Sequence, residues 1–264
     1  MPITMIDMDH VLEQEAAFAD AQYEKYEHDL DINEKNFRHF ADPSDFTNWQ
    51  ARMGEQLGDV SGKRLLDLGC GVGKHSVFFA KLGADVTAID ISPRGIENLK
   101  RRAAHNNVDV DARLMACPTT LPDHSFDLIF GVGIVHHVGL DECLNEVRRL
   151  LKPGGRAVFF EPMGNSRSVE AAKKWLHDRF ANRLDLEPIT DHETVLNWSD
   201  VKKYRKNFRS VTMYPYELMY RVRKFFPSPL WNVFWVTDHH LLKWVTPLSY
   251  FAGSMVLTLE TESD

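Results

Sequence analysis

Short apolar runs alternate with amphipathic stretches through the middle of the chain. Continuous apolar runs predict buried strands, and apolar residues at helical spacing predict helices that pack against them. The predicted strands span residues 64–68, 85–90, 109–115, 126–132 and 156–161, and the predicted helices span residues 73–82, 93–106 and 141–151. Alternation of this kind builds a parallel sheet whose right-handed crossovers place helices on both faces.

The pattern changes on either side of this region. Helices are predicted before it, over residues 8–30 and 45–57. After it we expect helices over 168–180, from 199, over 216–225 and over 231–244, and strands over 208–214 and 254–260. The chain is therefore expected to have a helical N-terminal segment (1–60), an α/β core (61–162), and a C-terminal part (163–264) that combines a helical insertion with the last two strands.

A glycine-rich turn follows the first predicted strand. Leu65–Leu68 runs into Gly69, Gly71 and Gly73, and an amphipathic helix begins directly afterwards. Glycines suit such a turn because the backbone bends sharply and a ligand can approach where no Cβ intervenes. The turn is neither a phosphate-binding loop, since His75 stands where Ser or Thr is needed, nor a dinucleotide loop, since Ser76 or Lys74 stands at its third glycine.

An acidic residue closes the second predicted strand about twenty positions downstream. Asp90 stands where a carboxylate can hold ribose hydroxyls. Ser92 then serves as the predicted N-cap of the next helix, with Pro93 at its first position. Ligands of parallel sheets bind at the carboxyl ends of the strands, so a nucleoside ligand is favoured there.

Composition limits the class of partner and the compartment. The formal net charge is −7 and Lys and Arg form no large block, which argues against nucleic acid. Three cysteines without metal-ligand spacing favour a reducing cytoplasm. The N-terminus has no signal-peptide pattern, and no apolar run is long enough to span a membrane.

Five motifs in order resemble the class I S-adenosylmethionine-dependent methyltransferases of the small-molecule type (methyltransferase type 11/25-like). They are the glycine turn (65–73), the strand end with Asp90 (88–92), Leu121-Pro122 with Ser125–Ile129, His136-His137-Val138, and Leu150–Gly155 followed by a strand. The resemblance covers roughly residues 45–162. It implies a Rossmann-like sheet of seven mostly parallel strands with an antiparallel last strand, and a helical lid before the first strand.

The resemblance also implies which residues hold S-adenosylmethionine. The backbone of Gly69–Gly73 would hold the methionine portion and Asp90 the ribose. The full set is Asp67, Gly69, Cys70, Gly71, Gly73, Asp90, Ile91, Ser92, Ala116, Cys117, Pro118, Gly131 and Val132. The family usually has a carboxylate for the adenine amino group where this chain has Cys117, so we expect one changed polar contact.

Three residues are candidates for catalysis. Histidine titrates near neutrality and can take a hydroxyl proton during methyl transfer. By resemblance, His137 is the expected base, with His136 beside it and Tyr26 or Tyr23 of the N-terminal helix as its partner. A role of the histidine pair in packing alone is the alternative.

The expected activity is methylation of a small-molecule acceptor at oxygen, and three alternatives stay open. Carbon or nitrogen methylation could rely on proximity alone, the chain could bind a nucleoside without catalysis, and a protein or RNA substrate is disfavoured by the charge. Adjacent histidines on a helix point to different faces, so Asp238-His239-His240 is expected to bind no metal. Aromatic residues between 225 and 251 predict core packing, an apolar or ring-binding acceptor pocket, or a lipid or homodimer surface.

Overall fold

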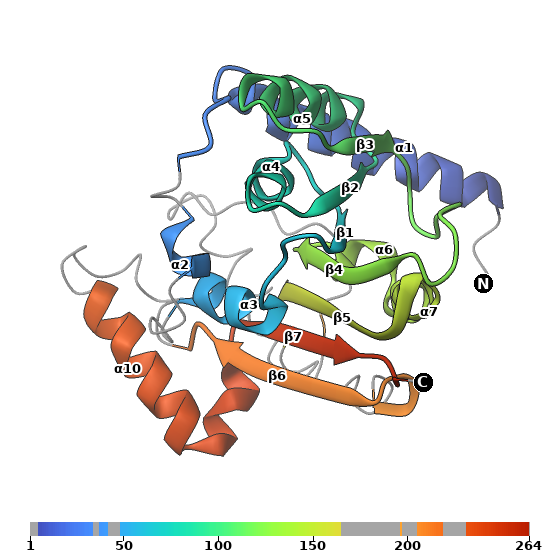
Figure 1. The fold of residues 1–264 in the computed structure, drawn as a ribbon. Coiled ribbons are helices and arrows are strands. Elements are labelled where there is room, and N and C mark those ends of the chain that lie inside the picture. The colour runs from blue at the N-terminus through green and yellow to red at the C-terminus, as the bar shows by residue number, and fades with distance from the viewer. Residues whose placement is uncertain are drawn as a thin grey trace.

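The computed structural model describes residues 5–33, 37–41, 48–164, 196, 205–218 and 231–263. Within these residues seven strands form one sheet in the order β3-β2-β1-β4-β5-β7-β6 (Figure 1). The strands are β1 (Arg64–Leu68), β2 (Asp85–Asp90), β3 (Asp111–Leu114), β4 (Phe126–Val132), β5 (Leu151–Pro162), β6 (Ser210–Tyr216) and β7 (Ser254–Glu260). β1 to β5 pair in parallel and β7 is antiparallel to both its neighbours, which confirms the predicted fold class.

Helices cover both faces of the sheet. The main ones are α3 (Trp49–Leu57), α4 (Lys74–Lys81), α5 (Pro93–His105) and α7 (Leu140–Leu150). Because side chains of a strand alternate between faces, Leu65 joins the core beneath α3, α4 and α5 while Leu66 joins the core beneath α7. Both side chains are fully buried, and the near-continuous apolar strands that the sequence shows follow from this two-sided burial.

The N-terminal segment lies along α5 (Figure 1). It consists of α1 (Met5–Tyr23) and the single turn η1 (Glu24–Tyr26), followed by an extended stretch and the short α2 (Arg38–Ala41). Asn106 at the end of α5 accepts a hydrogen bond from the amide of Ile32 and donates one to the carbonyl of Leu30. The segment is thereby tied to α5 at its far end.

Most predicted boundaries agree with the structure to within two residues, and a few differ by more. The helix predicted over 8–30 is wrong at its end, since α1 ends at Tyr23 and η1 at Tyr26. β1, β2, β4, β7 and α10 (Trp231–Trp244) have the predicted ranges, and Ser92 caps α5 with Pro93 in its first turn, as predicted. β5 begins five residues early, because Leu151 pairs with Phe126 before a register shift. The helix predicted over 216–225 is wrong at its start, since Tyr216 pairs with Ser254 in β6, and residues 219–225 lie outside the described part. The helix predicted over 168–180 and the start of the one from 199 also lie outside it.

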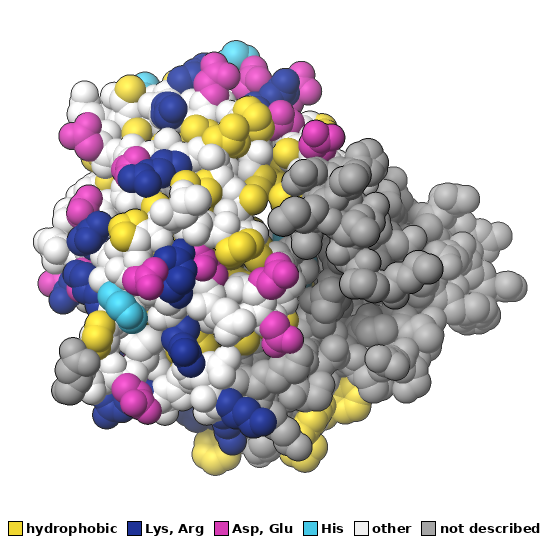
Figure 2. All heavy atoms as spheres, turned by 90° about the vertical axis from the view of Figure 1, so that its right-hand side faces the viewer, with side chains coloured by type: hydrophobic (Ala, Val, Ile, Leu, Met, Phe, Trp, Pro, Cys, Tyr) yellow, Lys and Arg dark blue, Asp and Glu magenta, His cyan; other side chains and the backbone are white. Residues whose placement is uncertain are grey.

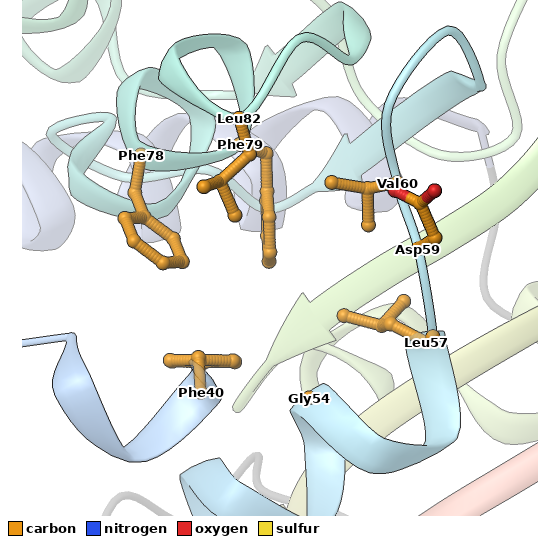
Figure 3. A pocket seen from close by; sticks show the side chains of 9 residues that line it. Phe40, Gly54, Leu57, Asp59, Val60, Phe78, Phe79 and Leu82 are labelled. Carbon is orange, nitrogen blue, oxygen red and sulfur yellow. The ribbon is translucent and has the colours of Figure 1, made fainter. Parts of the chain in front are cut away.

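An apolar cavity of about 220 Å³ lies between α2, α3 and α4. Phe78 and Phe79 point from α4 toward Phe40 of α2, and Leu57 and Val60 close the other side (Figure 3). Val60 precedes β1, so this cavity lies at the amino edge of the sheet, opposite the glycine turn.

Charged side chains of both signs are interspersed on the face shown in Figure 2, among the described residues. This face therefore offers no continuous basic surface. In the part of the chain that the structure describes, none of the helices combines the length and apolar character needed to cross a membrane.

Candidate active site

The glycine turn adopts backbone conformations that other residues rarely take. Gly69, Gly71 and Gly73 have φ values of +72°, +51° and +75°. A Cβ on Gly69 would lie 2.6 Å from the side chain of Ile134, and one on Gly73 would lie 2.2 Å from Leu99. The turn thus contacts both the loop after β4 and helix α5, and only glycine fits at these positions.

The amides of the turn are bonded within the protein. The N–H groups of Gly69 and Cys70 both donate to the carbonyl of Ile89 at 3.0 Å. The N–H of Gly71 donates to Oδ2 of Asp90 at 2.7 Å. These contacts place β2 directly beside the turn, and they engage its first amides within the protein.

Asp90 is the residue that joins the turn to helix α5. Its Oδ1 accepts from the amide of Ser92 at 2.9 Å, and its Oδ2 accepts from Gly71. Burial raises the pKa of Asp90, while the two amide donors act in the opposite direction. A carboxylate offers about four lone-pair sites, so the two amides leave acceptor capacity for ribose hydroxyls.

Helix α1 reaches the same place from the N-terminal segment. Asp20 accepts hydrogen bonds from Oγ of Ser92 and from the amide of Arg94. The hydroxyl of Tyr23 lies 3.1 Å from where a Cβ on Gly71 would be, and its ring lies 3.2 Å from the corresponding position on Gly95. Burial, followed by the charge of Asp90, raises the pKa of Tyr23, so its phenol stays protonated.

The loop after β3 begins beside Asp90. The amide of Met115 donates to the carbonyl of Asp90 at 2.9 Å, so Ala116, Cys117 and Pro118 follow at the end of β2. Glu146 of α7 holds this loop by accepting from both the amide and the hydroxyl of Thr119, each at 2.7 Å. Burial, and then the nearby charge of Glu146, raises the pKa of Cys117 to about 12.

The histidine pair lies on α6 (Val135–Val138), which begins three residues after Val132, the last residue of β4. Nδ1 of His136 is 2.8 Å from Oε2 of Glu161, a fully buried carboxylate at the end of β5. The two imidazole rings are 4.1 Å apart between centroids. His137 is more exposed, and its Nδ1 lies 3.5 Å from Oε2 of Glu15 on α1.

Tyr23 and Tyr26, the alternative partners expected for His137, both have contacts near the glycine turn. Tyr23 covers Gly71, and Nζ of Lys74 lies over the ring of Tyr26 at 4.8 Å from its centroid. Glu15, which lies 3.5 Å from His137, is eight residues or about 12 Å along α1 from Tyr23.

Comparisons with known proteins identify the family. A methyltransferase-domain family model matches residues 66–159. The demethylmenaquinone methyltransferase of Tropheryma whipplei (strain Twist) is 34% identical over 162 residues, which are 58% of this chain and 67% of that protein. The chain is a class I S-adenosylmethionine-dependent methyltransferase. A ubiquinone biosynthesis O-methyltransferase of Xanthomonas oryzae pv. oryzae (strain PXO99A) is 36% identical over 101 residues, 37% of this chain and 42% of that one.

Solved structures share the fold of this methyltransferase. The geranyl diphosphate C-methyltransferase of Streptomyces coelicolor A3(2) superimposes with a TM-score of 0.58 at 16% identity, over 80% of this chain and 76% of that chain. The [4+2]-cyclase SpnF superimposes with a TM-score of 0.53 at 18% identity, over 81% and 80% of the two chains. Since these names include a cyclase, the fold alone does not determine the reaction.

The site of the methyltransferase fits its cofactor, S-adenosylmethionine. The positive φ values of its three glycines give the turn the sharp bend that brings it beside Asp90, and Asp90 keeps acceptor capacity at the end of β2. Asp67, nearly fully buried behind the turn, accepts from Oγ of Ser76 at 2.5 Å, and burial raises its pKa to about 7. An ionised Asp67 would be compensated by the positive charges of the sulfonium and ammonium groups.

Sequence reasoning missed Glu161, Glu15 and Asp20. Glu161 could have been noticed as a lone acidic residue at the end of an apolar strand, in Phe159-Phe160-Glu161. Glu15 and Asp20 lie in an acidic helix without any distinguishing motif. Among the described residues, no group of three His, Cys, Asp or Glu side chains is placed to hold a metal ion. Asp238 is buried and His240 exposed, and the side chain of His239 lies outside the described part.

Proposed function

We propose that this methyltransferase transfers a methyl group to a hydroxyl oxygen of a small molecule, with the histidine pair His136-His137 supplying the proton acceptor. The observation that supports this most directly is the contact between the glycine turn and the histidine-bearing loop. The side chain of Ile134 lies against Gly69, so the cofactor turn and the histidines share one edge of the sheet.

The chemistry divides between cofactor and protein. S-adenosylmethionine supplies an activated methyl group, whose bond to sulfur breaks with its electron pair going to sulfur as the acceptor oxygen bonds to carbon. The protein must hold the reacting groups in line. In this proposal Asp90 holds the ribose, the glycine turn the methionine portion, and the loop from Ala116 to Pro118 the adenine.

A hydroxyl acceptor also needs a group that takes its proton. Histidine is suited to this because its pKa lies near neutrality. From the sequence, His137 is the expected base, and its side chain is partly exposed. Glu15 would orient it, in the role that the sequence assigned to Tyr26.

The names of the relatives suggest a class of acceptor. One is named for methylation of demethylmenaquinone and another for O-methylation in ubiquinone biosynthesis. A quinol carries an aromatic ring with an acidic hydroxyl, and we propose an acceptor of that kind. The aromatic residues of the C-terminal part would line its pocket or a homodimer contact, and Trp244, Tyr250 and Phe251 are more than half exposed.

The proposed organisation follows the sequence. Residues 1–60 would form a lid, 61–162 would hold the cofactor, and 163–264 would complete the acceptor pocket. The contacts of Asp20 and Tyr23 at the start of α5 support the lid. The three cysteines are all free thiols, which supports a cytoplasmic location.

Calorimetry with S-adenosylhomocysteine tests the cofactor site. Wild-type protein should bind it, Asp90→Asn should bind at least about tenfold more weakly, and Asp85→Asn, at the exposed start of the same strand, should bind normally. Equal affinity of all three would contradict the assigned role of Asp90.

Labelled S-adenosylmethionine with menadiol and with catechol tests the acceptor atom. We expect label in a methyl ether, with turnover that rises with pH as the base loses its proton. Label on a ring carbon or on nitrogen would support proximity catalysis instead. Binding of the cofactor with no transfer to any acceptor would support the non-catalytic alternative.

A further inference from the structure

Glu161 is an unusual residue for the inside of a protein. Its side chain has no exposed surface, and it lies near the end of β5, after the apolar residues 157–160. A buried carboxylate is costly unless it is hydrogen-bonded, so its partners show what it stabilises.

Three donors surround this carboxylate. Oε1 accepts from the amides of Ile134 and Val135, both at 2.9 Å, and Oε2 faces Nδ1 of His136 at 2.8 Å. The two amides open the turn that carries the histidine pair. They hold Oε1 in place, and they leave Oε2 for the imidazole.

This arrangement selects one tautomer of His136. An ionised carboxylate has no proton to donate, so Nδ1 of His136 must carry the hydrogen of that bond. In the neutral ring Nε2 is then a hydrogen-bond acceptor. The Cε1 atom, next to Nε2, lies 3.7 Å from where a Cβ on Gly133 would be, so this edge faces the turn after β4.

We propose that Glu161 is a positioning residue that presents Nε2 of His136 to the acceptor hydroxyl, so that His136 rather than His137 takes the proton. The proposal rests on the proposed function and deepens it. We call Glu161 and His136 the dyad. The end of β5 positions Glu161, Glu161 orients the imidazole of His136, and His136 contacts the substrate.

The proton balance follows from the same contacts. The hydroxyl proton passes to Nε2 as the oxygen forms its new bond, and His136 becomes an imidazolium with protons on both nitrogens. The charge of Glu161, 2.8 Å from Nδ1, stabilises that imidazolium without itself taking a proton. His137, against Glu15 and the neighbouring ring, then forms part of the wall of the acceptor site.

Glu161→Gln tests the tautomer without an acceptor. The amide oxygen of this variant should keep the two backbone donors, which turns its NH₂ toward Nδ1 of His136 and moves the ring proton to Nε2. Nitrogen NMR of histidine-labelled protein, with His136→Asn used for assignment, reads this directly. We expect an Nδ1–H ring in wild type and an Nε2–H ring in the variant, and an Nε2–H ring already present in wild type would overturn the proposal.

Turnover with menadiol and S-adenosylmethionine tests the catalytic consequence. We expect kcat to fall at least about 10²-fold in Glu161→Gln while the affinity for S-adenosylhomocysteine is unchanged. His136→Asn offers a second measurement if the first variant folds poorly. Its amide can replace the Nδ1–H donor to Glu161 but has no group at Nε2, so the same fall in kcat is expected.

Two controls separate this mechanism from a structural role. Glu260→Gln makes the same acid-to-amide change at a carboxylate that pairs with Arg156 in the middle of β5, five residues from Glu161, and it should leave kcat unchanged. The double variant Glu161→Gln with His136→Asn should lose no more kcat than either single variant, because both changes remove the lone pair on Nε2 of His136. An additive double variant, or full activity in either single one, would overturn the dyad.

The outcome for the proposed function is read separately. Failure of wild type to bind S-adenosylhomocysteine would contradict the cofactor site, whatever the tautomer of His136. Normal binding and turnover in wild type would support the methyltransferase activity. Loss of activity in His137→Asn but not in His136→Asn would then identify His137 as the base.

Discussion

The hydroxyl of Tyr23 lies 3.1 Å from the position that a Cβ on Gly71 would occupy. The end of α1 therefore lies directly over the glycine turn, although the turn is about fifty residues later in the chain. Gly71→Ala would press against this phenol and would also hold alanine at a φ of +51°. We expect the affinity for S-adenosylhomocysteine to fall about tenfold and stability to fall by about 1 kcal/mol, as measured by calorimetry and thermal unfolding.

Gly62→Ala is the matched control. Gly62 has a φ of +68°, but no atom lies within 4 Å of its Cβ position. This variant should lose a similar amount of stability and keep full cofactor affinity. Equal affinity loss in both variants would mean that backbone strain, rather than the contact with Tyr23, weakens binding.

The fully buried Arg102 joins the N-terminal segment to the glycine turn. It donates to the carbonyls of Val72 and Asp29. Arg102→Met should destabilise the protein by about 3 kcal/mol, because it leaves two carbonyls without their charged donor. Chemical denaturation measures this loss, and Arg101→Met, at the exposed neighbouring position, should cost far less. A small effect at Arg102 would show that water replaces the guanidinium.

The buried Asp67 predicts a pH-dependent stability. Its pKa is raised by burial from the usual value near 4 to about 7, so the fold favours the protonated carboxyl. The stability that Asp67 contributes is full below about pH 4 and is lost as the pH rises through about 7. Asp67→Asn, which cannot ionise, should therefore gain stability relative to wild type between pH 5 and pH 8.

Denaturation of both proteins at the two pH values checks this prediction, because other titrating groups cancel in the difference. The hydroxyl of Ser76 can still donate to the amide oxygen of the variant. A difference that does not change with pH would show that Asp67 stays in one ionisation state throughout that range.

Cys117 stands where the family usually has a carboxylate. Burial and the charges of Glu146 and Glu142 raise its pKa, so the position disfavours a negative charge. Cys117→Asp should lower the thermal midpoint more at pH 8 than at pH 5 and should not improve cofactor affinity. The neutral Cys117→Ser is the control. Tighter binding of S-adenosylhomocysteine by Cys117→Asp at pH 8 would instead show that the family contact to adenine has been restored.

The strands could be predicted because their residues carry local signals. Leu65 and Leu66 face opposite cores, which produces a continuous apolar run, and Ser92 with Pro93 marks the start of α5. The early start of β5 could not be predicted, since Lys152-Pro153-Gly154-Gly155 has the composition of a turn. Only the pairing of Leu151 with Phe126 reveals that the strand element begins there.

Some residues of the candidate site carry a local signal in the sequence. The glycine turn and Asp90 follow from spacing alone, and the structure places them in contact at 2.7 Å. Side chains that meet across the fold give no such signal. Glu161 lies 25 residues from His136, and Glu15 lies on a helix whose acidic residues look alike in sequence.

The position of β7 has a consequence for how the protein is made. β7 lies between β5 and β6, although it follows both in the chain. A ribosome therefore releases β6 before the strand that connects it to the sheet exists, and β6 must wait, unpaired on that side, for residues 254–260. A premature stop before Ser254 would consequently detach two strands rather than one, and would leave the edge of β5 open to aggregation.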